Sequence, residues 1–260
     1  MAGSVMRVEV ITLFPELVEQ VTRYGMPRIA VEQGRLALST RNPRDYSANK
    51  WRRVDARPYG GGPGMVMEAE PLAAAVADAK KAIGAADGAT RVPPMVPKVI
   101  YLSPQGSRFD QRWAERLSAE QGLILLCGRY EGLDERVLAA EVDFELSLGD
   151  FVLSGGELAA MAVIDAIARL LPGVLGDEQS AVNDSFSAGL LDHPHYTRPE
   201  VWRDAGVPDV LMSGDHAKIA RWRRQQALGQ TWLKRPELLD GLELDEDSRA
   251  LLRDFIAQRR

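Results

Sequence analysis

The sequence lacks several features that would place it outside the soluble globular proteins. Its 260 residues include one cysteine, Cys127, so no disulfide framework can form within the chain. Cys127 ends an apolar run that starts at Gly122, and no histidine lies near it in the sequence, so we interpret it as a core residue rather than a catalytic thiol. No apolar run approaches the roughly 18 residues of a membrane helix, and residues 1–8 lack the apolar segment of a signal peptide. We therefore expect a soluble, cytoplasmic protein with no membrane partner.

The usual signatures of phosphate and metal sites are also missing. No loop reads G-x-G-x-x-G at the start of a helix and none reads G-x-x-x-x-G-K-[ST], so neither a dinucleotide site nor a P-loop is expected. His193 and His195 are a lone pair in a loop and His216 stands apart, so we predict no metal site. The net charge of -5 disfavours a wholly basic nucleic-acid-binding surface, although binding depends on where the cations lie. Composition alone leaves an enzyme and a binding module undecided.

Strand and helix patterns alternate along the larger, N-terminal part of the chain. They predict strands at 8–13, 36–40, 98–102, 123–126 and 142–147, one helix that begins near Phe14, and helices at 70–83, 111–119 and 157–171. Such alternation indicates an α/β domain with a mainly parallel sheet. With 45% hydrophobic residues, the chain can bury one large core, or one core and a smaller domain.

The pattern changes after Gly173, and we place a domain boundary there. Residues 174–196 mix Gly, Asp, Asn, Ser, Pro and His without an apolar period, as in a flexible linker or an active-site lid. Beyond them, 216–228 and 248–257 have helical patterns. We therefore predict an α/β domain over 1–173, a flexible linker over 174–196 and a small, mostly α domain over 197–260.

Three glycine-rich elements, at 59–65, 128–132 and 147–157, come after or between the predicted strands. Glycine lets the backbone approach a ligand closely and adopt positive φ, so that amide and carbonyl groups can bind a base or a ribose. Any one of these loops taken singly is more often a tight turn, as is Ser103 to Gly106 after the strand at 98–102. Three in one domain favour a cofactor cleft, and the missing phosphate signatures favour a nucleoside without a polyphosphate.

Cations and aromatic rings lie together in the C-terminal part. The cations are Lys218, Arg221, Arg223 and Arg224, and the rings are Trp222 and Trp232. Arginine pairs with phosphates and tryptophan stacks on an unstacked base, which is typical of RNA-binding proteins. A solvated amphipathic helix with core tryptophans explains the same pattern, so both interpretations stay open.

Longer motifs are similar to those of a known family. They are Val10-Ile-Thr-Leu-Phe-Pro-Glu16, Arg57-Pro-Tyr-Gly-Gly-Gly-Pro-Gly-Met65, Tyr101-Leu-Ser-Pro-Gln-Gly106, Leu126-Cys-Gly-Arg-Tyr-Glu-Gly132, Gly149-Asp-Phe-Val-Leu-Ser-Gly-Gly-Glu157, Pro172-Gly-Val-Leu-Gly176, Asp184-Ser-Phe186 and Leu191-Asp-His-Pro-His-Tyr-Thr-Arg-Pro199. In this order, and continuing to Arg235-Pro-Glu-Leu238, the chain resembles the TrmD family of bacterial tRNA (guanine-N1)-methyltransferases.

The resemblance implies the SPOUT fold, an α/β domain whose cofactor-binding part is a deep trefoil knot. General topology rules make knots rare, so the strand pattern alone could not have indicated one. An obligate homodimer that binds S-adenosyl-L-methionine in the knot is also implied. By position, the implied cofactor-binding residues are Tyr101, Leu102, Ser103, Pro104, Gln105, Gly106, Gly128, Tyr130, Glu131, Leu148, Gly149, Asp150, Phe151, Val152, Leu153, Gly155 and Gly156.

The resemblance further implies methyl transfer to N1 of the guanosine immediately 3′ of the tRNA anticodon. Asp184 is the implied general base and Arg169 its electrostatic partner, with Asp184 supplied by the linker of the opposite subunit. From the residues alone, Asp184 would be interpreted as an ordinary loop or helix-capping aspartate. The family also implies Mg²⁺ dependence, with no ligand set visible in this sequence. The cations of the C-terminal domain would then bind the tRNA anticodon arm.

The chain departs from the family pattern at a few positions. Ala56 replaces a common aspartate and Trp51 a common histidine, which affects nucleotide or tRNA contacts. Phe151 replaces a frequent tyrosine, losing the hydroxyl group but keeping the ring. The loop from Ala86 to Pro97 is longer than usual, and we assign it no function.

Two other functions are compatible with parts of the pattern. A SPOUT methyltransferase with another RNA target would share the cofactor motifs, because these motifs report the cofactor and not the base. A non-catalytic RNA-binding module would keep the cations, but intact Asp184 and Arg169 disfavour it.

Overall fold

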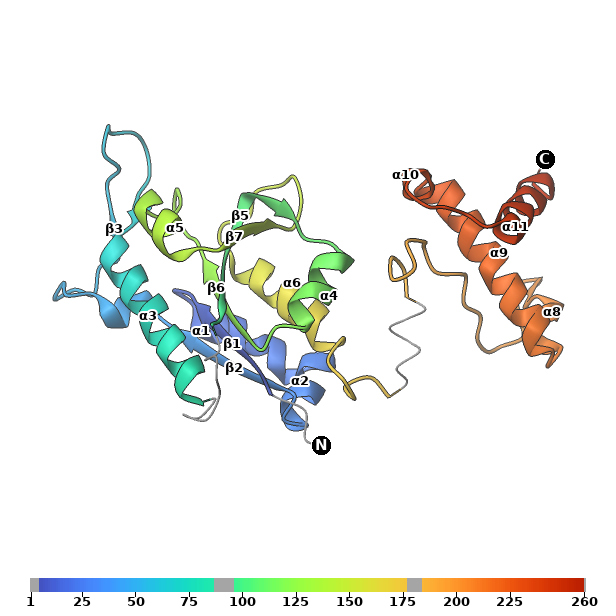
Figure 1. The fold of residues 1–260 in the computed structure, drawn as a ribbon, viewed down its shortest axis with the longest axis horizontal. Helices are drawn as coiled ribbons and strands as arrows, with labels where there is room; N and C mark the ends of the chain where they lie inside the picture. Colours follow the sequence, from blue (N-terminus) through green and yellow to red (C-terminus); the bar gives the residue numbers. More distant parts are fainter. Residues whose placement is uncertain (1–4, 87–95, 177–183, 260) are drawn as a thin grey trace. The chain divides into compact units, whose positions relative to one another are not determined.

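The computed structural model describes residues 5–86, 96–176 and 184–259, and the chain divides into two compact units (Figure 1). The first unit is Met1–Gly176 and the second is Asp177–Arg260. Most of the loop from Ala86 to Pro97, and residues 177–183 of the predicted linker, lie outside the described residues.

A parallel sheet of five strands forms the centre of the first unit. In spatial order its strands are β2 (Leu36–Arg41), β1 (Met6–Ile11), β6 (Gly122–Cys127), β5 (Lys98–Arg108) and β7 (Phe144–Ser147). Every pairing within it is parallel. The prediction of an α/β domain with a mainly parallel sheet is therefore confirmed. A small antiparallel pair, β3 (Asp55–Ala56) and β4 (Val66–Met67), lies outside this sheet and was not predicted.

Side chains on both faces of the sheet are buried, as expected for parallel strands covered by helices. All six residues of β6 are buried, and the five from Leu123 to Cys127 alternate between two cores. Leu123, Leu125 and Cys127 pack in the core that contains residues of α1 (Pro15–Glu19), α2 (Gly25–Glu32), α4 (Gln111–Ser118) and α6 (Glu157–Ala168). Ile124 and Leu126 pack in the core that contains residues of α3 (Ala69–Ala86) and α5 (Glu135–Glu141), and Figure 1 shows α3 and α6 on opposite sides of the strands.

Cys127 is a core residue, as predicted, and only 2% of its surface is exposed. Burial raises the pKa of its thiol well above the ordinary value, and the carboxylate of Glu157 adds to this effect. The thiol therefore stays protonated and unreactive near neutral pH.

The first predicted helix is broken, which corrects the expectation of one continuous helix. After α1 comes the 3-10 turn η1 (Gln20–Arg23), and α2 then begins separately. Tyr24 between them is extended, with φ -140° and ψ 162°, and Gly25 has φ 60°. An α-helix cannot continue through either conformation.

Other boundaries also differ from the predicted ones. α3 continues over Gly84 to Ala86, where a loop was expected, and β5 continues through Ser103 to Gly106 to end at Arg108. Helix α5 and the 3-10 turn η2 (Pro43–Tyr46) were not predicted. Pro104 does not end β5 because it lies where the pairing with β7 shifts in register between Leu102 and Ser107, and such irregularities tolerate a residue without an N–H group.

The second unit is built on one long helix, α9 (His216–Lys234), which is longer than the predicted segment. The other elements in the described part of this unit are the hairpin β8 (Val201–Trp202) and β9 (Ala205–Gly206), and the helices α8 (Asp209–Met212), α10 (Glu237–Asp240) and α11 (Glu246–Ala257). Among the described residues, no helix combines the length and the apolar character needed to cross a bilayer.

Both described flanks of the predicted linker pack against their own units. Val174 is buried in a core of the first unit. Leu190 is buried with Leu228 and Leu251 in the second unit, where the backbone N–H of Leu191 donates to Oγ1 of Thr231 at 2.9 Å. The segment that begins at 184 is thus held against α9 by apolar contact and by a hydrogen bond.

Two helical glycines allow a matched test of packing. In α9, a Cβ atom added to Gly229 would overlap the ring of buried Phe255 from α11, whereas one added to Gly84 in α3 would meet nothing within 4 Å. Gly229→Ala should lower the free energy of unfolding by about 1–3 kcal/mol through overpacking. Gly84→Ala should raise it by up to about 1 kcal/mol through helix propensity. Urea unfolding of both variants, followed by hydrogen exchange of α9 and α3, checks this; equal effects of the two substitutions would contradict the packing at Gly229.

Candidate cofactor cavity and nucleic-acid surface

Three segments meet at one edge of the parallel sheet in the first unit. They are the irregular stretch of β5 after Leu102, the loop after Cys127 at the end of β6 and the loop after Ser147 at the end of β7, and together they line a cavity of about 250 Å³. Open parallel sheets bind their ligands at this edge, because the carboxyl ends of adjacent strands lie together there.

The cavity brings together residues from all three predicted segments. It is lined by every predicted cofactor-binding residue except Gln105, Gly106 and Asp150. Further lining residues that the motifs did not predict are Arg129, Gly132, Leu146, Ser147, Ser154 and Ala159. Phe151, which replaces the tyrosine common in relatives, lines the cavity with about half of its surface exposed.

Gly106 has a structural role in the sheet. A Cβ atom there would overlap the backbone of β7 at Glu145 and Leu146. Only glycine therefore allows β5 to resume its pairing with β7, where Ser107 lies opposite Leu146.

Two further glycines permit close packing around the cavity. A Cβ atom on Gly128 would lie 2.8 Å from the ring and hydroxyl group of Tyr101, and one on Gly156 would lie 2.7 Å from the Cα atom of Cys127. The backbone N–H of Gly156 donates to the carbonyl of Gly128 at 3.0 Å, which fixes the third loop against the second. Burial raises the pKa of Tyr101, as does the nearby charge of Glu145, so its hydroxyl group stays protonated and able to donate.

The first glycine-rich motif supports the cavity from outside. Gly64, at φ 79°, lies against the side chain of Glu131, and any Cβ atom there would overlap it. The backbone N–H of Glu131 donates to the carbonyl of Met65 at 2.9 Å, and that of Met67 donates to the carbonyl of Gly132 at 2.9 Å. The motif at 59–65 therefore positions the second loop rather than lining the cavity.

An ion pair that the sequence motifs did not indicate joins the loops. Arg129 Nη2 lies 2.9 Å from Oε2 of Glu157, and Arg129 Nε donates to Oε1 of the same carboxylate at 3.2 Å. Glu157 is 1% exposed and also accepts from Oγ1 of Thr12 at 2.9 Å. Arg129 donates in addition to the carbonyl of Ser154 at 3.1 Å, and its guanidinium group lies over the ring of Phe14. The sequence offered two weak signals for this pair. Arg129 lies between Gly128 and Gly132, and Glu157 begins an apolar helix.

The proposed catalytic residues belong to different units. Arg169 follows α6 as its C-terminal cap and is half-buried. Asp184 is half-buried in the second unit and lines a cavity of about 300 Å³ together with Arg223 and Arg224 of α9.

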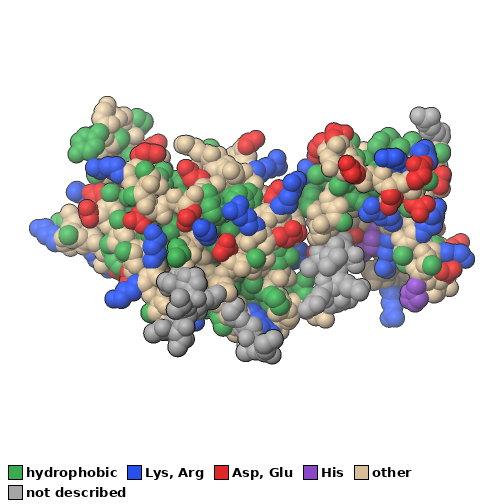
Figure 2. Space-filling model, viewed as in Figure 1, with side chains coloured by type: hydrophobic (Ala, Val, Ile, Leu, Met, Phe, Trp, Pro, Cys, Tyr) green, Lys and Arg blue, Asp and Glu red, His purple; other side chains and the backbone are tan. Residues whose placement is uncertain are grey.

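The predicted nucleic-acid-binding cations are all exposed on α9. They are Lys218, Arg221, Arg223 and Arg224. Lys218 Nζ lies 3.2 Å from a carboxylate oxygen of Asp215. Figure 2 shows basic and acidic side chains interspersed on the visible face of each unit, which agrees with the absence of a wholly basic surface.

The fold and the first cavity define a class of protein, namely α/β proteins that bind a small ligand between glycine-rich segments at one edge of a parallel sheet. A family model described as "tRNA (Guanine-1)-methyltransferase TrmD" matches residues 6–241. Since that match covers most of the chain, the chain belongs to this family, and the resemblance found in the motifs is confirmed.

Curated relatives agree with the family model. Proteins named tRNA (guanine-N(1)-)-methyltransferase from Halorhodospira halophila, Chromohalobacter salexigens and Vibrio atlanticus are 59%, 54% and 54% identical to the chain. These comparisons cover 98% of the chain in each case, and 92%, 94% and 100% of the relatives.

The ion pair of Arg129 can be tested by removing one partner. Arg129→Met keeps most of the side-chain volume but leaves the buried Glu157 carboxylate without its cation, which should lower the free energy of unfolding by about 3 kcal/mol. Arg136→Met is the matched control, because Arg136 also pairs with an acid, Asp134, but its side chain is 78% exposed. That exposed pair should contribute little. Denaturant unfolding measures both, and an equal loss in the two variants would show that the Arg129 pair stabilises no more than a surface contact.

Proposed function

We propose that the chain transfers a methyl group from S-adenosyl-L-methionine to N1 of the guanosine immediately 3′ of the tRNA anticodon. The observation that supports this most directly is the cavity formed by three family motifs at the carboxyl ends of β5, β6 and β7. We also propose that the enzyme works in the cytoplasm as a homodimer. In this proposal, 1–173 bind the cofactor, 174–196 link the domains and 197–260 bind tRNA.

The chemistry of the cavity fits this methyl donor. Apolar side chains such as Leu102 and Leu148 can cover a base, while glycine-rich backbone offers hydrogen-bonding groups to a base edge or a ribose. The carboxylate of Glu131 is on the same lining and can face a cation. When bound, S-adenosyl-L-methionine supplies a methyl group on a positively charged sulfur atom and leaves as a neutral thioether.

The path of the chain is compatible with the trefoil knot of the SPOUT family. β7 lies at an edge of the sheet, but the chain returns from it to β6, where Gly156 donates to Gly128. α6 then packs in the same core as α1, α2 and α4. In the proposed knot, this return threads through the connection between β5 and β6.

Asp184 and Arg169 supply the acid–base and electrostatic parts of the proposed mechanism. Guanine N1 carries a proton and is a poor nucleophile until that proton leaves. A carboxylate within hydrogen-bonding reach accepts the proton, which is typically worth a factor of ~10² to 10⁴ in rate. The negative charge passes to O6, where the guanidinium group of Arg169 stabilises it. The acceptor nitrogen must also be held in line with the methyl carbon at near-attack distance.

Recognition of tRNA is assigned to the second unit. The exposed cations of α9 can pair with phosphates of the anticodon arm. Asp184 shares a cavity with two of these cations, Arg223 and Arg224, so an unstacked guanosine whose phosphates contact α9 would lie near the proposed base.

We assign no step to Mg²⁺. Among the described residues, one group of three or more side chains could hold a metal ion, namely Asp192, His193 and His195. Two imidazoles do not match the oxygen ligands that Mg²⁺ prefers.

Substrate specificity tests the proposed function directly. Labelled S-adenosyl-L-methionine should transfer its methyl group to an unmodified transcript with guanosine 3′ of the anticodon, and not to the same transcript with adenosine there. Asp184→Asn keeps the shape but cannot accept the proton, so transfer by this variant should fall by ~10²-fold or more. Equal labelling of the two transcripts would exclude the substrate assignment.

The proposed sharing of sites between subunits makes a second prediction. A mixed dimer combines one Asp184→Asn chain with one Gly128→Val chain, whose added side chain obstructs the cavity next to Tyr101. If Asp184 serves the cavity of the opposite subunit, one site of this dimer carries both lesions and the other carries neither. About half of the wild-type activity should then return.

Each parent homodimer serves as the control for this experiment and should be inactive. The mixed dimer is isolated through two different affinity tags, and its initial rate is compared with that of wild type. A mixed dimer as inactive as its parents would show that Asp184 acts on the cofactor of its own subunit.

A further inference from the structure

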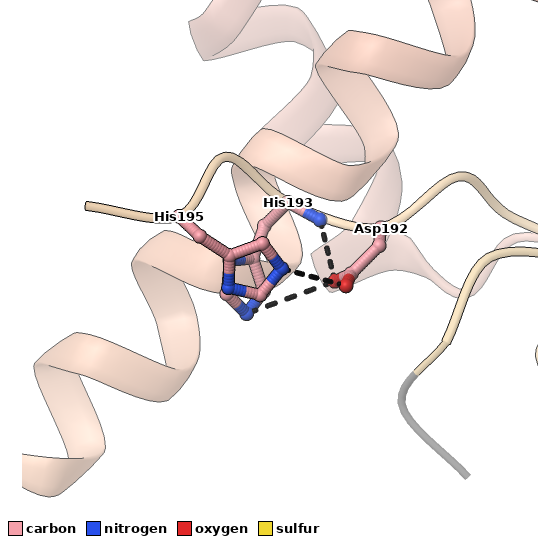
Figure 3. Close-up of side chains that lie close together, drawn as sticks. All are labelled: Asp192, His193 and His195. Atoms are coloured by element: carbon pink, nitrogen blue, oxygen red, sulfur yellow. Dashed lines mark hydrogen bonds and ion pairs between the residues drawn. The ribbon is translucent and has the colours of Figure 1, made fainter. Parts of the chain in front are cut away.

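Three polar side chains converge in the second unit outside the residues assigned to methyl transfer (Figure 3). Oδ2 of Asp192 lies 2.8 Å from Nε2 of His195, and Oδ1 lies 3.7 Å from Nε2 of His193. Each residue offers one atom that could bind a metal ion, and these three atoms lie within 4.8 Å of one another. The sequence indicated no metal site because the two histidines alone lack a metal-ligand pattern, and only the structure adds Asp192 to them.

The local chain explains this convergence. His193 and His195 are two positions apart in a segment without helical structure. In an extended chain this spacing places both imidazole rings on the same side of the backbone. The carboxylate of Asp192 is oriented by the backbone N–H of His193, which donates to Oδ1 at 2.7 Å, and the backbone N–H of Asp192 donates to Oγ of Ser185 at 3.0 Å. The rings of His193 and Trp222 in α9 lie 6.3 Å apart, edge to face.

The hydrogen bonding also determines which ring nitrogen of His193 is available. Its Nδ1 lies 3.1 Å from the carbonyl oxygen of Pro194, and a carbonyl can only accept, so this nitrogen carries the proton when the ring is neutral. Nε2 then presents a lone pair toward Asp192. A hydrogen bond from the other ring nitrogen to a carbonyl is the usual outer contact of a metal-ligating histidine.

We propose that Asp192, His193 and His195 bind a divalent cation of the zinc class. Tetrahedral Zn²⁺ with bonds of about 2.0–2.1 Å places its ligand atoms about 3.3 Å apart. The contacts of 2.8 and 3.7 Å involve different oxygens of Asp192. One ligand atom from each residue lies within 4.8 Å of the other two, so side-chain rotations would have to bring these atoms closer together. Two imidazoles and one carboxylate form a ligand set that Zn²⁺, Co²⁺ and Ni²⁺ accept and Mg²⁺ does not favour. Water would occupy the fourth position, because His195 is 70% exposed.

A bound ion would stiffen the segment that leads into the second unit. Asp192 and His193 also line the cavity that contains Asp184 and Arg223. The ion would therefore fix one wall of that cavity. This site does not depend on the proposed methyl transfer, and its test measures metal binding alone.

Cobalt provides the spectroscopic test, since Co²⁺ replaces Zn²⁺ in tetrahedral sites and then absorbs strongly in the visible range. Titration of the full-length protein with Co²⁺ should give one such site per chain, and added Zn²⁺ should abolish the absorption while excess Mg²⁺ should not. His193→Gln and His195→Gln should each lose this absorption. His216→Gln is the matched control and should keep it, because His216 is the remaining histidine of the chain.

Asp192→Asn separates a metal site from a simple ion pair. Removal of the carboxylate charge should weaken Co²⁺ binding at least tenfold, while circular dichroism confirms that each variant is folded. The proposal would be overturned by absence of tetrahedral Co²⁺ absorption in the wild type, by displacement with Mg²⁺, or by equal binding in folded His193→Gln and His195→Gln variants. In those cases the Asp192–His195 contact would be a hydrogen bond only.

Discussion

The ion pair between Arg129 and Glu157 is the constraint on which the cofactor cavity depends. Glu157 begins α6, Arg129 follows β6, and Thr12 follows β1, so one buried carboxylate joins three elements at the carboxyl edge of the sheet. The chain from β7 to α6 must cross this edge, and Arg129 occupies the space where a side chain on Gly155 would lie. Such a buried carboxylate is costly unless it is paired, so the cavity wall and the stability of the first unit depend on the same contact.

The sequence predicted the central sheet well because its main signal is local. Short continuous apolar runs such as 123–126 favour buried strands in an alternating α/β chain, and β6 is buried at every position. Boundaries were less predictable, since they depend on conformations set elsewhere. The helix break at Tyr24 has two local signals, Gly25 and Pro27, whereas β5 continues past Pro104 because β7 resumes its pairing beyond the irregularity. A proline normally indicates the end of a strand, and only the neighbouring strand reveals the exception.

The site was predictable where it consists of contiguous motifs and not where it consists of distant pairs. Glycine-rich loops after strands indicated a cavity because glycine permits close backbone approach, and long motifs carried the family assignment. Arg129 and Glu157 are 28 positions apart, so neither local pattern revealed that they form a pair. The glycines at 59–65 were interpreted as a binding loop, but they do not line the cavity, and Gly64 is favoured by its φ of 79° beside the side chain of Glu131. The proposed metal site was missed for a related reason. The sequence shows that Asp192 precedes two histidines, but only the structure shows that its carboxylate faces both rings.

Under the proposed function, the methyl donor and the general base are held by different units, and this has an energetic consequence. The cavity of the first unit is shaped by buried contacts that exist without tRNA, such as the hydrogen bond from Gly156 to Gly128. Asp184 is positioned by contacts of the second unit, where Leu190 and Leu191 hold its segment on α9. Near-attack geometry between N1 and the methyl group then requires both units to engage one tRNA, so binding energy from phosphate contacts on α9 is used to assemble the reacting groups. A small guanine derivative lacks those phosphates. It could enter the site without bringing Asp184 to the methyl donor. For this reason the arrangement selects for tRNA at the chemical step as well as at binding.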